Sequence, residues 1–251
     1  RFQEFKAFRE KSEEEINTCE NDLNVKNVTE NLDNEYKNYF NRVLRIDTMK
    51  ITSAQLDFSR VFPADSDAPE LISKNIFRSK KPENVLVYPV VENFGEGIFF
   101  SFNEKNLNEY LDSEGGANII KELQEKLSKL NKGDDFSRGA IEYGESMNWQ
   151  LYLVHSFTHL IMRELEFRCG YPTASLSERI YVSNDDKYKM YGCLIYTTEG
   201  AEGSMGGLIA QTREKNLNNL IKSAIHRATI CHSDPLCWES EGQGLFDLNF
   251  A

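Results

Sequence analysis

Two histidines four residues apart are the residues of this sequence whose type and spacing most directly suggest chemistry. They are His155 and His159, in the apolar segment W-Q-L-Y-L-V-H-S-F-T-H-L-I-M-R-E-L. On a helix this spacing places both imidazoles on one face, where they can hold a metal ion. Ser156 stands where a His-Glu-x-x-His metalloprotease carries its general base, which argues against that class of hydrolase. Two interpretations stay open. The histidines bind a metal or take part in catalysis, with Glu178 as a further candidate, or they are buried structural residues that form hydrogen bonds to a neighbouring group.

A glycine-rich segment is the second candidate site. Gly203, Ser204, Gly206 and Gly207 follow the apolar run G-C-L-I-Y-T-T and precede an expected helix. Backbone N–H groups at such a strand-to-helix turn can bind an anion. The segment matches neither the P-loop nor the G-x-G-x-x-G pattern, so only this geometry favours a nucleotide. The alternative is a tight turn with close helix–strand packing, a common role of glycine.

A cysteine pair near the end of the chain is the third candidate site. Cys231 and Cys237 flank H-S-D-P-L, where Asp-Pro predicts a turn that brings the two sulfurs together. Two thiolates are half of a tetrahedral zinc site, which requires four ligands, and His232 is a further candidate. Cys169 and Cys193 lie in an expected helix and an expected strand, so we expect them to be core thiols.

The elements that must position these residues are helices mixed with short strands, which predicts an α/β (mixed α+β) fold. We expect a central, buried apolar helix, a small sheet, the glycine-rich strand-to-helix turn and a C-terminal cysteine knuckle. An apolar stripe at helical spacing predicts that the N-terminal helix docks on neighbouring structure through Phe2, Phe5, Phe8 and Ile16. The expected helices are 1–24, 35–45, one capped by Asn103, 117–130, one from Trp149 and one from about Gly206; the expected strands are 85–91, 98–102 and 192–198; the expected loops and turns are 24–34, 93–97 and 131–135.

Composition limits the classes of function. The chain has 251 residues and a formal net charge of -11, which argues against a broad nucleic-acid-binding face. No apolar run approaches the length of a membrane span. Five cysteines, an odd and sparse set without a secretory signal, favour a reduced, cytoplasmic protein. The first residue, Arg1, and the apolar end before Ala251 suggest that both ends lie inside a longer protein.

The order of several motifs resembles a known family. H-S-F-T-H-L, S-E-R-I-Y, L-I-Y-T-T-E-G-A-E-G-S-M-G-G-L and C-H-S-D-P-L-C are similar to the C-terminal helicase-associated, MrfA zinc-binding-like domain of the DrmB family in the DISARM phage-defence system. The resemblance covers about Trp149 to Ala251, and N-F-G-E-G-I-F-F-S-F upstream is also similar. It implies an accessory subunit of a superfamily-2 helicase or translocase that acts on invading DNA in bacteria. It also implies a second cysteine pair, which would complete a zinc site with Cys231 and Cys237 and would begin where this chain ends.

These observations predict two regions and two competing functions. Residues 1–135 are expected to form an N-terminal α+β region, and residues 136–251 the helicase-associated, zinc-binding-like domain, truncated at its C-terminus. The favoured function is a non-catalytic accessory subunit that binds a helicase or translocase and reaches DNA directly or through that partner. The alternative is a metal-dependent phosphodiesterase or nuclease that uses His155, His159, Glu178 and the glycine-rich turn. A third option is nucleotide binding by the turn without hydrolysis.

Overall fold

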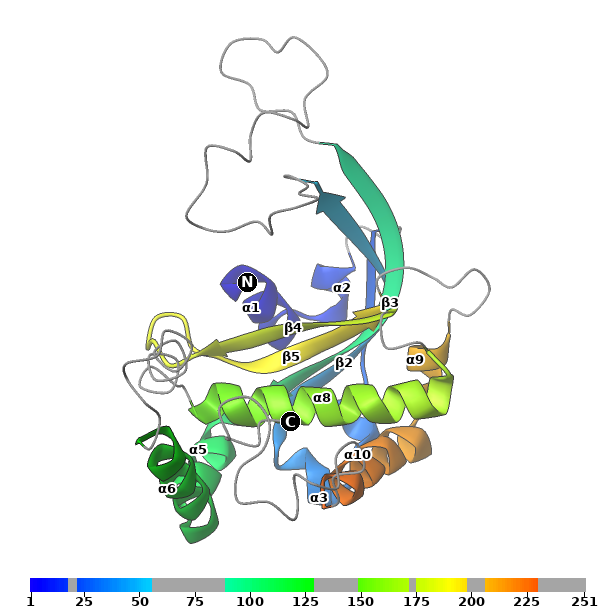
Figure 1. Ribbon diagram of the computed structural model, residues 1–251. Coiled ribbons are helices and arrows are strands. Elements are labelled where there is room, and N and C mark those ends of the chain that lie inside the picture. Colours follow the sequence, from blue (N-terminus) through cyan, green and yellow to red (C-terminus); the bar gives the residue numbers. More distant parts are fainter. Residues whose placement is uncertain (18–21, 56–88, 129–148, 172–174, 198–205, 230–251) are drawn as a thin grey trace, which may run out of the picture.

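The computed structural model describes residues 1–17, 22–55, 89–128, 149–171, 175–197 and 206–229. Helices and strands are interspersed along the chain, which confirms the mixed α/β class. None of the helices in these ranges combines the length and apolarity needed to cross a membrane. The elements, shown in Figure 1, are α1 (Phe2–Glu10), α2 (Glu13–Ile16), β1 (Leu23–Asn27), the 3-10 turn η1 (Thr29–Asn31), α3 (Asn34–Lys37), β2 (Phe40–Ala54), β3 (Val90–Phe102), α5 (Glu104–Asp112), α6 (Glu114–Ser128), α8 (Trp149–Cys169), β4 (Leu176–Ser183), β5 (Met190–Thr197), α9 (Gly207–Gln211) and α10 (Glu214–Ala228).

One antiparallel sheet joins the two ends of the described chain. Its strand order is β1-β2-β3-β5-β4. β3 pairs with β5 from Gly97↔Tyr196 to Ser101↔Gly192, so strands from both sides of the expected boundary at 131–135 share one sheet. The boundary residues themselves lie outside the described ranges. β2 and β3 pair along their whole length, and their far ends leave the sheet as a curved two-stranded ribbon (Figure 1).

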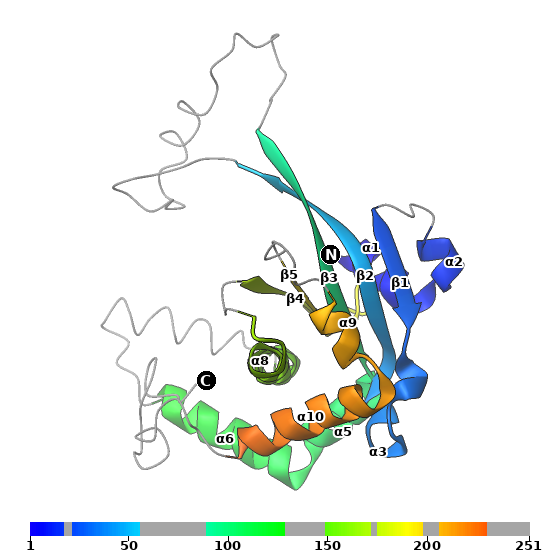
Figure 2. The same ribbon diagram turned by 90° about the vertical axis from the view of Figure 1, so that its right-hand side faces the viewer.

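Both faces of the sheet are covered by helices. Phe99 packs with Phe5 and Phe8 of α1 on one face, whereas the next residue, Phe100, packs with Phe157 of α8 on the other. This alternation is the normal consequence of the two-residue repeat of a strand. Figure 2 shows α8 nearly end-on, with the sheet between it and the pair α1 and α2. The expected burial of Phe5 and Phe8 at helical spacing is confirmed.

Several expected elements are confirmed where local signals are strong. α5 begins after Asn103, whose side chain accepts a hydrogen bond from the backbone N–H of Asn106. α6 covers the described part of the helix expected over 117–130, and β5 covers residues 192–197 of the strand expected over 192–198. Residues 129, 130 and 198 lie outside the described ranges. α8 begins at Trp149, as expected. In each case a cap or an apolar run within the segment was sufficient to locate the element.

The expected elements between residues 24 and 45 are partly wrong. β1 lies where a loop was expected, and β2 begins at Phe40, inside the helix expected over 35–45. α3 is only one turn long. Val43, Leu44 and Ile46 are completely buried, because β2 lies inside a sheet that is covered on both faces. A strand buried on both faces loses the alternation of apolar and polar residues, so its pattern resembles that of a helix.

The turn expected over 93–97 and the hairpin around it are also wrong. β3 continues through this segment and pairs with β2 instead. A Cβ atom added to Gly97 would lie 2.8 Å from the carbonyl oxygen of Ile195, and one added to Gly95 would overlap the carbonyl oxygen of Thr197. These glycines therefore allow close approach of two strands and do not form a turn. Of the strand expected over 85–91, residues 85–88 lie outside the described ranges.

Candidate functional site

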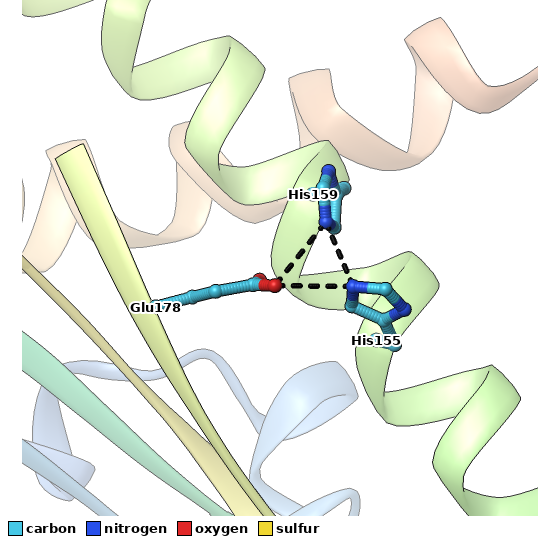
Figure 3. Close-up of side chains that lie close together, drawn as sticks. All are labelled: His155, His159 and Glu178. Carbon is cyan, nitrogen blue, oxygen red and sulfur yellow. Dashed lines mark hydrogen bonds and ion pairs between the residues drawn. The ribbon is translucent and has the colours of Figure 1, made fainter. Parts of the chain in front are cut away.

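The two histidines and Glu178 converge on one point between α8 and β4 (Figure 3). The His155 Nε2 atom lies 3.0 Å from Glu178 Oε1, and the His159 Nε2 atom lies 3.4 Å from the same oxygen. The two Nε2 atoms are 2.8 Å apart. The structure thus brings together the three residues that the sequence offered as catalytic candidates.

The secondary structure explains this convergence. His155 and His159 share one side of α8 because they are one helical turn apart. Glu178 lies two residues after Leu176, which packs in the core on the α8 side of the sheet, so both side chains point to that side. The next residue, Arg179, points to the opposite side and bonds to the Glu4 carboxylate on α1.

The expectation of a central, buried helix is only partly correct for α8. The buried residues of α8 lie along one side: Val154, Thr158, Ile161, Glu164 and Leu165. The side chains of His155 and His159 are each 47% exposed, whereas that of Glu178 is 25% exposed. The histidine side of α8 is half-exposed because the sheet and α10 pack against other sides of this helix. The histidines are therefore accessible to small solutes.

Electrostatic coupling links the three side chains. The hydrogen bond to Glu178 raises the pKa of His159 above its ordinary value, against the opposing effects of burial and of Arg163. Burial alone would raise the pKa of Glu178, but the hydrogen bonds and charges of His159 and His155 outweigh it and lower that pKa. The second carboxylate oxygen, Glu178 Oε2, is buried and has no hydrogen-bond partner among the described residues. Two imidazole nitrogens and a carboxylate are ligands that zinc and similar ions accept, and they are also groups that can transfer a proton.

The glycine-rich turn binds an anion that belongs to the protein itself. The backbone N–H groups of Gly206 and Leu208 donate to the two oxygens of Glu96, at 2.7 and 2.8 Å. The Tyr171 hydroxyl donates to the same carboxylate at 2.7 Å, and Glu96 is completely buried. The expected anion-binding geometry is therefore present at Gly206 and the start of α9, but it is filled by Glu96.

Two glycines of the turn, Gly206 and Gly207, lie in the described part of the chain, where backbone conformation and packing explain them. Gly206 has a φ of 111°, which favours glycine, and a Cβ atom on Gly207 would lie 2.5 Å from the Tyr171 hydroxyl oxygen. Gly203 and Ser204 lie outside the described residues. Nothing in the sequence indicated that Glu96 would bind this turn, because its segment N-F-G-E-G predicted only a turn of its own.

The histidine cluster and the glycine turn lie at different places along α8. α9 contacts the C-terminal end of α8, whereas the histidines lie in its N-terminal half (Figure 1). From His159 to Cys169 the helix rises about 15 Å, at roughly 1.5 Å per residue. The described residues of the turn therefore do not complete one site with the histidines.

The cysteines fall into two groups. Cys193 is completely buried in β5, and burial raises the pKa of its thiol to about 12. Cys169 is partly buried at the end of α8, where burial raises the pKa of its thiol to about 11. Both are inert thiols at neutral pH, as expected for core cysteines. The candidate zinc ligands Cys231 and Cys237, and His232 between them, lie outside the described residues.

Comparison with known proteins finds a bacterial relative of the chain. No protein-family model matches it. It is similar to the DISARM protein DrmB of Bacillus paralicheniformis, with 30% identity over 209 residues. The alignment covers 83% of this chain but 36% of that protein, so the chain spans just over a third of the length of its curated relative. The similarity supports a relationship to DISARM DrmB, in agreement with the resemblance seen in the motifs.

Proposed function

We propose that this chain is part of an accessory subunit of a bacterial anti-phage defence complex of the DISARM type. The observation that carries the proposal is the similarity to the DISARM protein DrmB over 83% of the chain. In this proposal the subunit works in the cytoplasm, binds a helicase or translocase subunit and helps it to engage invading DNA. DNA is reached directly or through the partner.

Charge and exposed apolar residues support a protein partner more than a broad DNA-binding face. The net charge of -11 repels a phosphate backbone unless basic residues are concentrated locally. On the ribbon formed by β2 and β3, the residues Val90, Val91 and Phe94 are 54%, 59% and 44% exposed. Exposed apolar groups on a projecting ribbon favour contact with another protein. This ribbon is therefore the first surface to test.

A co-purification experiment tests the proposal. The 251-residue chain and a longer protein that contains it are each expressed with the helicase subunit of the same defence system. We expect stable co-purification with the longer protein and a change in the ATPase activity or DNA affinity of the helicase. Val91→Asp should weaken the complex, whereas Ile225→Asp on α10, at a similarly exposed apolar side chain, is the matched control. A protein that neither binds the helicase nor changes its activity would refute the accessory role.

We also propose zinc as a cofactor of the complete protein, with Cys231 and Cys237 as two of its ligands. The support is the resemblance, in which a second cysteine pair follows the first. Metal analysis of this chain beside the longer protein tests the assignment. Zinc that is present in the longer protein and is released by Cys231→Ser would support it, whereas zinc content that is unaffected by this substitution would contradict it.

A metal-dependent phosphodiesterase or nuclease is the second candidate function. Its support is the convergence of His155, His159 and Glu178. It is weakened because the amides of the glycine turn bind Glu96 and lie far from the histidines. Metal-dependent cleavage of DNA that disappears in His159→Ala would favour this candidate over the non-catalytic role. Absence of cleavage with zinc, manganese and magnesium would exclude it.

A further inference from the structure

We propose that His155, His159 and Glu178 form a binding site for one divalent transition-metal ion, with zinc as the expected metal. The site lies on the solvent-facing side of α8, where this helix meets β4 (Figure 3). It is separate from any zinc held by Cys231 and Cys237. It also does not depend on the accessory role, because it is argued only from the geometry and chemistry of these three side chains.

The three donor atoms already have nearly the spacing that a tetrahedral ion requires. Their separations are 2.8, 3.0 and 3.4 Å. With zinc–ligand distances of about 2.0–2.1 Å, the donors of a tetrahedral site lie about 3.3–3.4 Å apart. Small rotations of two half-exposed imidazoles would increase the shorter separations by the few tenths of an ångström that are needed.

Hydrogen bonding alone cannot satisfy the three contacts at the same time. An imidazole Nε2 atom carries either one hydrogen or one lone pair. If both histidines donate to Glu178, their nitrogens have no hydrogen bond to each other, although they lie 2.8 Å apart. If one histidine donates to the other, the acceptor nitrogen has no hydrogen for Glu178. A metal ion replaces these hydrogens and satisfies all three donor atoms.

The second oxygen of Glu178 is an independent indication of a ligand. Within the part of the chain that the structure describes, Glu178 Oε2 is buried and has no hydrogen-bond partner. A buried carboxylate oxygen without a partner is costly, and native proteins generally supply a partner for it. A cation bound at Oε1 would compensate the charge of the whole carboxylate, and bidentate coordination would use Oε2 directly.

The donor set indicates which metals the site prefers. Two imidazoles and one carboxylate suit zinc and neighbouring transition metals, whereas magnesium and calcium prefer oxygen ligands. Three protein ligands leave a fourth position for water or an anion, as in zinc sites with two histidines and a glutamate. Arg163 lies one helical turn beyond His159, and its positive charge favours an anionic fourth ligand. Ser156 supplies no general base, so the inference concerns binding and extends to no reaction.

Titration of the full 251-residue chain with zinc and with cobalt(II) tests the site. We expect one equivalent of cobalt to bind without a thiolate-to-metal charge-transfer band, because no cysteine is among the proposed ligands. A cysteine site would produce that band and is thereby distinguished. His159→Ala and Glu178→Gln should each weaken this binding at least tenfold, whereas His226→Ala, at an exposed histidine of α10, should leave it unchanged. Magnesium at the same concentration should not compete.

Two results would overturn the inference. One is that the chain binds no equivalent of cobalt or zinc other than metal held by cysteine thiolates. The other is binding that persists in His159→Ala and Glu178→Gln with unchanged affinity. X-ray absorption of the zinc-loaded native chain gives a second measurement that needs no variant. Scattering from two imidazoles at one zinc atom supports the site, and its absence refutes it. Circular dichroism of each variant, compared with that of His226→Ala, shows whether a loss of binding reflects a loss of fold.

Discussion

Replacing Glu96 with glutamine tests whether a buried carboxylate holds the glycine turn and α9 against the sheet. Glu96 accepts hydrogen bonds from the Gly206 and Leu208 N–H groups and from the Tyr171 hydroxyl. Its own N–H group donates to the Thr197 hydroxyl. One residue of β3 therefore joins α9 and the segment after α8 through its carboxylate, and β5 through its backbone N–H group. Its side chain is completely buried.

The cost of the substitution follows from the number of donors. Glutamine has one carbonyl oxygen and one NH2 group, so at least one of the three donors faces another donor. A buried donor without an acceptor costs about 1–3 kcal/mol, and the remaining bonds lose the benefit of a charged acceptor. We therefore expect Glu96→Gln to lower the free energy of unfolding by about 2–4 kcal/mol. This is a large part of the roughly 5–15 kcal/mol that stabilises a typical domain.

Urea unfolding of the native chain and the variant measures this cost, with similar slopes required for the comparison. Tyr171→Phe is the matched control, because it removes one donor and leaves the carboxylate in place, and it should cost about 0.5–3 kcal/mol. Hydrogen exchange at the Gly206 and Leu208 amides should accelerate in Glu96→Gln. A Glu96→Gln variant as stable as the native chain, within about 0.5 kcal/mol, would refute the reasoning, since a change of that size is typical of surface positions.

Three further predictions concern the ion pairs between α8 and α10, the close approach of strands at Gly95, and the buried thiols. Glu164→Ala should lower the free energy of unfolding in urea by about 1–3 kcal/mol, because Arg168 of α8 and Arg227 of α10 lose their buried carboxylate partner. An unchanged free energy of unfolding would show that these ion pairs do not stabilise the fold. Gly95→Ala should cost about 1–3 kcal/mol by overpacking. Gly115→Ala in α6 should be neutral or stabilising, because the added Cβ would meet only the Ser113 hydroxyl oxygen, at 4.0 Å; equal effects of the two substitutions on the unfolding midpoint would contradict the close approach of strands. Burial raises the pKa of Cys169 to about 11, so at pH 8 only about one thiol in a thousand is ionised. The rate of Cys169 alkylation, measured by peptide mass spectrometry, should therefore rise about tenfold per pH unit between pH 8 and 10. Cys193 should react only in denaturant, and rapid labelling of the two thiols at pH 8 would contradict these expectations.

Local sequence signals located the elements that depend on residues close together in the chain. Asn103 identified the start of α5, because a cap and its helix are neighbours in sequence. The apolar run after Gly192 identified β5, and the spacing of His155 and His159 placed both on one side of α8. Each of these predictions required only a cap, a repeat of the helix or an apolar run.

The sequence was misleading where the environment of a segment decides its structure. The first part of β2, residues 40–45, appeared helical because the sheet is covered on both faces, a property that no residue of β2 reveals. Gly95 and Gly97 appeared to mark a turn, whereas their function is to let β3 approach the neighbouring strand. The same residue type serves both purposes, and only the neighbouring strand distinguishes them.

The sequence by itself determined the mixed α/β class, the histidine pair and the resemblance to the DrmB family. Only the tertiary structure decided what these features contact. Glu178 reaches the histidines because β4 packs beside α8, and Glu96 reaches the glycine turn although 110 residues separate it from Gly206. Contacts between distant residues depend on how helices and strands pack, and packing is a property of the whole chain. The anion-binding turn was therefore foreseen in its chemistry, whereas its ligand, a glutamate of the same protein, was not.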